Sequence, residues 1–190
     1  MSKIGLYSGT FDPVHNGHLR LAEHAIKELG LQQIWFLPER KPRRKQTVSD
    51  ISHRIAMLEI ASADNESIKI VQLAEDQFTL RGSLALLQSQ ARSAGLVLLM
   101  GSDNVPHLLD AWPDLEQYQS AFSIAVAQRV GHSQDTMAIL KKVELRFPEL
   151  DITLLSRSAD DMASSKARSH QSTDVPRQVL EYMKTHALYA

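Results

Sequence analysis

Short apolar runs rich in β-branched and aromatic residues alternate along this chain with longer segments whose apolar residues recur at helical spacing. The runs predicted as strands are residues 3–8, 33–38, 68–73, 96–100, 122–127 and 151–155. Strands separated by helices of about 10 to 15 residues form βαβ crossovers, which make neighbouring strands parallel. The alternation therefore predicts an α/β protein, built as a doubly wound parallel sheet with helices on both faces.

Segments with helical spacing lie between these strands and after the last one. Gly30 and Gly95 mark the ends of the first and third segments, and Ser49 or Asp50 is a suitable N-cap for the second. The predicted helices are residues 18–29, 50–63, 83–94 and 133–147, a short helix near Ser164 and a last one over 176–188. The chain is thus expected to end in a small helical part of about residues 160–190.

Length, cysteine content and charge narrow the class of protein. The 190 residues suffice for one buried core, so a single domain over 1–190 is expected. The absence of cysteine excludes disulfides and thiolate metal sites. A formal net charge of -1 gives no global attraction for nucleic acid, and no apolar run approaches the roughly 20 residues that cross a bilayer. We therefore expect a cytoplasmic protein with no nucleic-acid or membrane partner.

The loop after the first predicted strand carries the most informative motif, GTFDPVHNGHL, which starts at Gly9. Gly17 lets the backbone come close where the next helix begins, and backbone N–H groups at a helix N-terminus bind anions. His15 and His18 flank this point. Because ligands of an open parallel sheet bind beyond the carboxyl ends of its strands, the loop is a candidate phosphate site.

Three interpretations of the two histidines follow from the residues. They could cap and decorate a turn, bind a metal ion, or donate hydrogen bonds to phosphate oxygens whose charge grows in a transition state. A metal site would need a third ligand, and no HExxH-like spacing occurs in the chain. The combination of strand, Gly-Thr, Asp-Pro, glycine and paired histidines favours the phosphate interpretation.

The motif GTFDPVHNGHL resembles the signature of the nucleotidylyltransferase superfamily, in which the two histidines form an HxGH motif. The stretch LLMGSDNVPHLLDAW is similar to the region of bacterial nicotinate mononucleotide adenylyltransferases where a turn after a central strand precedes a helix and a tryptophan. MASSKAR, residues 162–168, resembles the superfamily's ISSTxIR motif, and VLEYMKTHALYA resembles the family's final helix followed by Leu-Tyr. The resemblance implies a Rossmann-like fold and a single nucleotidylyltransferase domain.

The resemblance also implies an activity, the transfer of AMP from ATP to nicotinate mononucleotide. The products would be nicotinate adenine dinucleotide, a precursor of NAD, and pyrophosphate, with Mg²⁺ held mainly through the ATP phosphates. Nicotinamide mononucleotide and phosphopantetheine are alternative acceptors, and a non-catalytic nucleotide-binding paralogue is the alternative outside the enzymes. The sequence indicates no particular oligomeric state, and a homo-oligomer is one of the states considered.

By the same resemblance, the catalytic residues would be donors to the phosphates, namely His15, His18 and Arg168. The residues expected around ATP are Gly9, Thr10, Phe11, His15, His18, Gly101, Asp103, Ser164, Ser165 and Arg168. The residues expected at the acceptor are Lys45, Thr79, Trp112 and Arg129. No residue is assigned as a metal ligand.

The acceptor half departs from the family pattern in two loops. Residues 42–45 are Pro-Arg-Arg-Lys where the family usually has Pro-His-Lys. Gly82 stands where a second threonine is expected after Thr79. In the family this second region helps to recognise the pyridine carboxylate, so the choice between acid and amide acceptors is left open.

Overall fold

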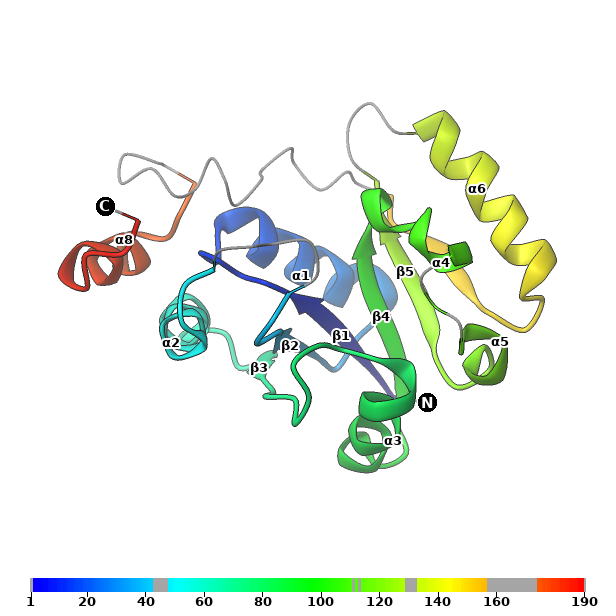
Figure 1. Cartoon of the computed structure of the whole chain (residues 1–190), viewed down its shortest axis with the longest axis horizontal. Helices are drawn as coiled ribbons and strands as arrows, with labels where there is room; N and C mark the ends of the chain where they lie inside the picture. Colours follow the sequence, from blue (N-terminus) through cyan, green and yellow to red (C-terminus); the bar gives the residue numbers. More distant parts are fainter. Residues whose placement is uncertain are drawn as a thin grey trace.

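The computed structural model describes residues 2–42, 48–110, 112, 114–128, 133–156 and 174–189. Within these ranges, six parallel strands form one sheet in the order β3-β2-β1-β4-β5-β6 (Figure 1). The strands are β1 (Lys3–Gly9), β2 (Gln33–Pro38), β3 (Ile68–Ile70), β4 (Gly95–Gly101), β5 (Ser123–Ala127) and β6 (Ile152–Leu154). This is the doubly wound, Rossmann-like order, and the predicted fold class is confirmed. The direction of winding reverses between β1 and β4, so the crevice for a ligand lies there.

Helices cover both faces of the sheet, as the alternation predicts. The helices in the described ranges are α1 (Asn16–Leu29), α2 (Ile51–Ser62), α3 (Leu80–Ala91), α4 (His107–Asp110), α5 (Leu115–Tyr118), α6 (Ser133–Arg146) and α8 (Arg177–Thr185), with a 3-10 turn at Ser102–Asn104. Apolar residues of α1, α2 and α8 are buried on one face, and those of α3 to α6 on the other. Helix α8 lies beside α2 and packs on it (Figure 1). None of the helices described is long and apolar enough to span a membrane.

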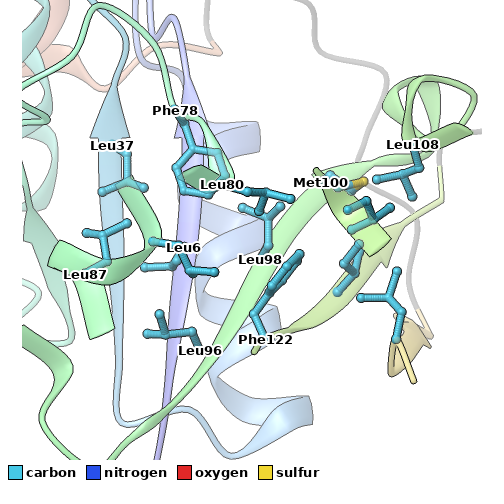
Figure 2. Packing of buried hydrophobic residues seen from close by; sticks show 14 of the residues in the cluster. Leu6, Leu37, Phe78, Leu80, Leu87, Leu96, Leu98, Met100, Leu108 and Phe122 are labelled. Carbon is cyan, nitrogen blue, oxygen red and sulfur yellow. The ribbon is translucent and has the colours of Figure 1, made fainter. Parts of the chain in front are cut away.

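Successive strand residues point into two different cores because side chains alternate across a sheet. Figure 2 shows the first core, where Leu6 and Leu37 of the strands meet Leu80 and Leu87 of α3. The second core holds the residues of opposite parity, such as Phe36, which is fully buried against α1, α2 and α8. The two cores fix the sheet rigidly and leave its carboxyl edge to the loops.

Helix α3 begins earlier than its apolar spacing predicts, at Leu80 instead of residue 83. Thr79 is its N-cap, with a side chain that accepts a hydrogen bond from the Gly82 N–H at 3.1 Å. A threonine cap satisfies a backbone donor that the first turn leaves open, and this stabilises the earlier start. The helix also ends earlier, at Ala91, and Gly95 is the first residue of β4 instead of a helix cap.

Other helices and strands begin or end where the sequence predicts, or are shorter than predicted. Gly30 caps α1 in the left-handed conformation, with φ 63°, and Asp50 caps α2 by accepting from the Ser52 N–H at 2.8 Å. Strand β3 pairs only as far as Ile70, where the prediction extends to residue 73. The last helix ends at Thr185. The short helix predicted near Ser164 lies outside the described residues.

Candidate active site

The loop between β1 and α1 crosses the carboxyl edge of the sheet beside the point where the winding reverses. His15 is the N-cap of α1, in extended conformation, and its carbonyl accepts the His18 N–H at 2.9 Å. The imidazole rings of His15 and His18 stack, with centroids 3.6 Å apart. His15 is buried and His18 is half-buried. The sequence therefore brings both histidines together at the positive end of a helix, where an anion is stabilised.

One hydrogen bond determines which nitrogen of His18 can donate to a ligand. The backbone N–H of His15 donates to Nδ1 of His18 at 3.2 Å. A neutral imidazole has one donor and one acceptor nitrogen, so a ring that accepts at Nδ1 carries its proton on Nε2. The His18 side chain is thus arranged as an Nε2–H donor.

The Phe11 side chain packs beneath the histidine loop, which comprises residues 10–18, from the end of β1 into the first turn of α1. Its backbone is left-handed, with φ 50°, and its ring is only 1% exposed. The ring packs edge-on against His18, with centroids 5.0 Å apart, and also against Tyr7 and Phe36. A Cβ at Gly9 would stand 3.1 Å from this ring, so a side chain at the last residue of β1 would press the Phe11 ring out of place by a few tenths of an ångström. Phe11, predicted at the ATP site, can meet a ligand through its backbone, since its ring is buried.

Hydrogen bonds connect the histidine loop to residues that are distant in the sequence. Asp12, 2% exposed, accepts a hydrogen bond from the Tyr189 hydroxyl and one from the Ser49 N–H at 3.3 Å. The Asn16 N–H, the first of α1, donates to the Asp174 carbonyl at 2.7 Å. No local motif indicates these long-range contacts, although Leu-Tyr near the C-terminus resembles the family's ending. Tyr189 gives that ending a structural reason.

The turn after β4 faces the histidine loop across the point where the winding reverses. Gly101 ends β4, and Ser102 of the following 3-10 turn is buried. Asp103 is exposed, and its carboxylate accepts from the Asn104 side-chain amide at 3.4 Å. Gly101 and Asp103 therefore stand at the same sheet edge as the two histidines.

The two described acceptor candidates lie around the start of α3. The ring of Trp112 is half-buried on the first core, with its centroid 6.1 Å from that of Phe78. Thr79 caps α3 and donates its hydroxyl to the Glu75 carboxylate at 2.9 Å. Its side-chain hydroxyl is therefore engaged within the protein.

Gly82, the departure from the family pattern, has a local reason in this structure. The Glu75 carboxylate lies directly over Gly82 and also accepts from the Ser83 hydroxyl at 3.3 Å. A Cβ at position 82 would collide with that carboxylate. The glycine makes room for a negative charge next to Thr79.

The remaining predicted site residues lie outside the described residues, and they are Lys45, Arg129, Ser164, Ser165 and Arg168. The structure brings together Gly9, Thr10, Phe11, His15 and His18, which lie along the end of β1, the following loop and the first turn of α1, with Gly101 and Asp103 at the neighbouring strand end. No cluster of three or more His, Asp or Glu side chains that could hold a metal ion occurs in the part of the chain that the structure describes.

The chain is similar to known proteins over its whole length. A family model described as cytidylyltransferase-like matches residues 6–175. A probable nicotinate-nucleotide adenylyltransferase of Thermomicrobium roseum is 34% identical over 199 residues, covering 100% of this chain and 92% of that protein. The chain belongs to the cytidylyltransferase-like family. The family resemblance of the histidine motif is thereby confirmed.

Other relatives agree with this assignment. The nicotinate-nucleotide adenylyltransferase of Bacillus subtilis is 29% identical, covering 100% of this chain and 99% of that protein. The solved structure of Plasmodium falciparum nicotinic acid mononucleotide adenylyltransferase complexed with NaAD has a TM-score of 0.78 at 18% identity, covering 100% of this chain and 98% of that chain. The structural likeness confirms the fold. Adenylyltransferases of this kind are generally metal-dependent.

Proposed function

We propose that this enzyme is a nucleotidyltransferase that moves the adenylyl group of ATP to nicotinate mononucleotide, giving nicotinate adenine dinucleotide and pyrophosphate. The observation that carries the proposal is the stacked His15–His18 pair at the N-terminus of α1, at the carboxyl edge of β1. Its relatives from Thermomicrobium roseum and Bacillus subtilis bear the name of this activity. The whole length of the chain aligns with them.

In the proposed reaction an oxygen of the acceptor phosphate attacks the α-phosphorus of ATP. A new oxygen–phosphorus bond forms, the bond from the α-phosphorus to the bridging oxygen breaks, and pyrophosphate leaves with that electron pair. His18 would donate its Nε2–H to phosphate oxygen as charge develops there, since its Nδ1 is occupied by the His15 N–H. The protein's main contribution is to align two anionic reactants and to supply fixed donors.

We further propose that Mg²⁺ is the metal and that ATP phosphate oxygens hold it. Mg²⁺ keeps several waters and takes one or two carboxylates beside substrate phosphates. Asp103, an exposed carboxylate at the carboxyl end of β4, fits that ligand requirement. Bound Mg²⁺ would neutralise the charge of the departing pyrophosphate. Lys45, Arg129, Ser164, Ser165 and Arg168 keep their predicted roles as further contacts to the two nucleotides.

The test is pyrophosphate release from ATP with three acceptors, namely nicotinate mononucleotide, nicotinamide mononucleotide and phosphopantetheine. We expect turnover with a pyridine mononucleotide, its loss when the metal is chelated, and its return when Mg²⁺ is added. ATP binding without turnover on any acceptor would reject the enzyme and favour a nucleotide-binding paralogue. Turnover with phosphopantetheine alone would reject the pyridine nucleotide.

A second acceptor, nicotinamide mononucleotide, is favoured by the position of Glu75. The family resemblance places recognition of the pyridine carboxylate near Thr79 and Gly82. The Glu75 carboxylate lies over Gly82, and it would repel a second carboxylate brought close to it. An amide acceptor avoids this repulsion.

Replacing Glu75 with glutamine is expected to shift selectivity toward the acid acceptor. The kcat/KM for nicotinate mononucleotide should rise relative to that for nicotinamide mononucleotide by about two- to fivefold, the size expected for an exposed charge pair. Asp76→Asn is the matched control, because the Asp76 carboxylate pairs with the Lys41 ammonium at 2.7 Å, whereas the neighbouring Glu75 carboxylate lies over Gly82. An unchanged ratio in Glu75→Gln would show that this carboxylate does not face the pyridine substituent.

A further inference from the structure

A single buried side chain connects two loops at the carboxyl edge of the sheet, the loop between β1 and α1 and the loop between β2 and α2. Arg54, on α2, is 0% exposed. Its guanidinium donates four hydrogen bonds, and all four acceptors are backbone carbonyls. The acceptors are Ser49 at 2.9 Å, Thr10 at 2.8 Å, Glu39 at 2.7 Å and Arg40 at 3.1 Å.

These carbonyls lie in the two loops that contain predicted site residues, namely the histidine loop and the loop after β2, to which Lys45 belongs. Thr10 is in the histidine loop, and Glu39 and Arg40 begin the loop after β2. The two loops also bond directly, since the Glu39 N–H donates to the Gly9 carbonyl at 3.0 Å. Arg54 therefore holds the carboxyl ends of β1 and β2 at a fixed distance from each other.

The hydrogen bond to Thr10 has a consequence on the ligand side. In a trans peptide unit the carbonyl and the following N–H point in opposite directions. Arg54 holds the Thr10 carbonyl toward the interior, so the N–H of Phe11 points away from Arg54. Phe11 is held with φ 50°, an uncommon conformation for a residue with a side chain, which persists only where the surroundings enforce it.

Burying the charged guanidinium of Arg54 costs desolvation free energy. Burial lowers the pKa of Arg54, and the nearby charges of Asp12 and Asp50 oppose that effect. Removing one side chain from a buried network leaves its partners unpaired, so Arg54 also contributes to stability. Its planar fork holds several carbonyls in one geometry, which a point charge does not do.

We propose that Arg54 is a positioning residue for adenylyl transfer. It acts through the Thr10 backbone, which sets the histidine loop against the loop after β2 so that both nucleotides are aligned. The proposal rests on the proposed function. Its expected signature is a loss in kcat, because a displacement of about 1 Å in a site that works by alignment lowers the rate by about 100-fold.

The experiment compares Arg54→Lys and Arg54→Met with the wild-type enzyme. Lysine keeps the charge but cannot reproduce the fork, and methionine keeps much of the volume without the charge. Val143→Ala is the matched control, since Val143 is 0% exposed in the first core, on α6, away from the loops that Arg54 bonds. Melting temperature, kcat, KM for ATP and the Kd of a non-hydrolysable ATP analogue are measured for each, with kinetics well below the lowest melting temperature.

We expect both Arg54 variants to melt earlier than the wild-type enzyme, because buried carbonyls lose their donor, and to lose about 100-fold in kcat at temperatures where they are folded. Val143→Ala should melt earlier while keeping its kcat. The proposal is overturned if the variants keep kcat within about twofold of Val143→Ala, or if neither variant folds, since Arg54 would then be a structural residue. A wild-type enzyme that releases no pyrophosphate with any acceptor would instead reject the proposed function.

Discussion

His18→Ala is expected to lower kcat for pyrophosphate release by about 100- to 1000-fold, the usual loss when one transition-state donor is removed. The contacts that orient the Nε2–H of His18 include the His15 N–H on Nδ1, the stacked His15 ring and the edge of the Phe11 ring. Such a donor is aligned before the reaction, so its removal raises the barrier without changing the fold. His18 is only half-buried, and the variant should therefore melt close to wild type.

Two further variants make this result specific. His18→Asn keeps a side-chain N–H donor and a carbonyl that can accept the His15 N–H, so part of the lost rate should return. His186→Ala removes an exposed histidine on the C-terminal side of α8 and should leave kcat unchanged. The assay is steady-state pyrophosphate release at saturating ATP. Near-normal turnover by His18→Ala would remove the basis of the proposed mechanism.

The sheet and the histidine site could be predicted because both depend on local sequence. The alternation of strands and helices determines the topology. Each of the six strands is a short apolar run that can be recognised from its own residues. The motif from Gly9 to His18 is one continuous stretch from the end of β1 into the first turn of α1, so its geometry follows from the turn and the helix start. The residues of the motif already favour a phosphate role, and the family resemblance adds adenylyl transfer as the activity.

The supports of the site could not be predicted, because they join residues far apart in sequence. Arg54 bonds a carbonyl 44 positions away, and Tyr189 bonds Asp12 across 177 positions. An arginine within an amphipathic helix is usually exposed, and nothing local shows that Arg54 is buried. Thr79 illustrates the reverse case, since a residue expected at the acceptor is also a helix cap. Cap and ligand-binding sequences use the same small polar residues, so spacing alone does not separate them.

Phe11→Ala is expected to lower the free energy of unfolding by about 3–5 kcal/mol, the range for a buried aromatic residue. The ring fills the space below Gly9 and contacts Tyr7, Phe36 and His18. Its loss leaves a cavity under the histidine loop and removes one of the contacts that orient His18. We therefore expect kcat to fall as well, at temperatures where the variant is folded. Urea unfolding and pyrophosphate release measure the two effects.

Comparison with Phe11→Gly tests the left-handed backbone of the loop. Glycine adopts positive φ without penalty, whereas alanine at φ 50° pays about 1–2 kcal/mol. Phe11→Gly should therefore be at least as stable as Phe11→Ala. The matched pair is Phe36→Gly and Phe36→Ala, because Phe36 is fully buried in β2, where glycine is about 0.5–1 kcal/mol worse than alanine. If glycine is the poorer replacement at both positions, the loop does not hold Phe11 in the left-handed conformation, and the histidine pair is not oriented as described.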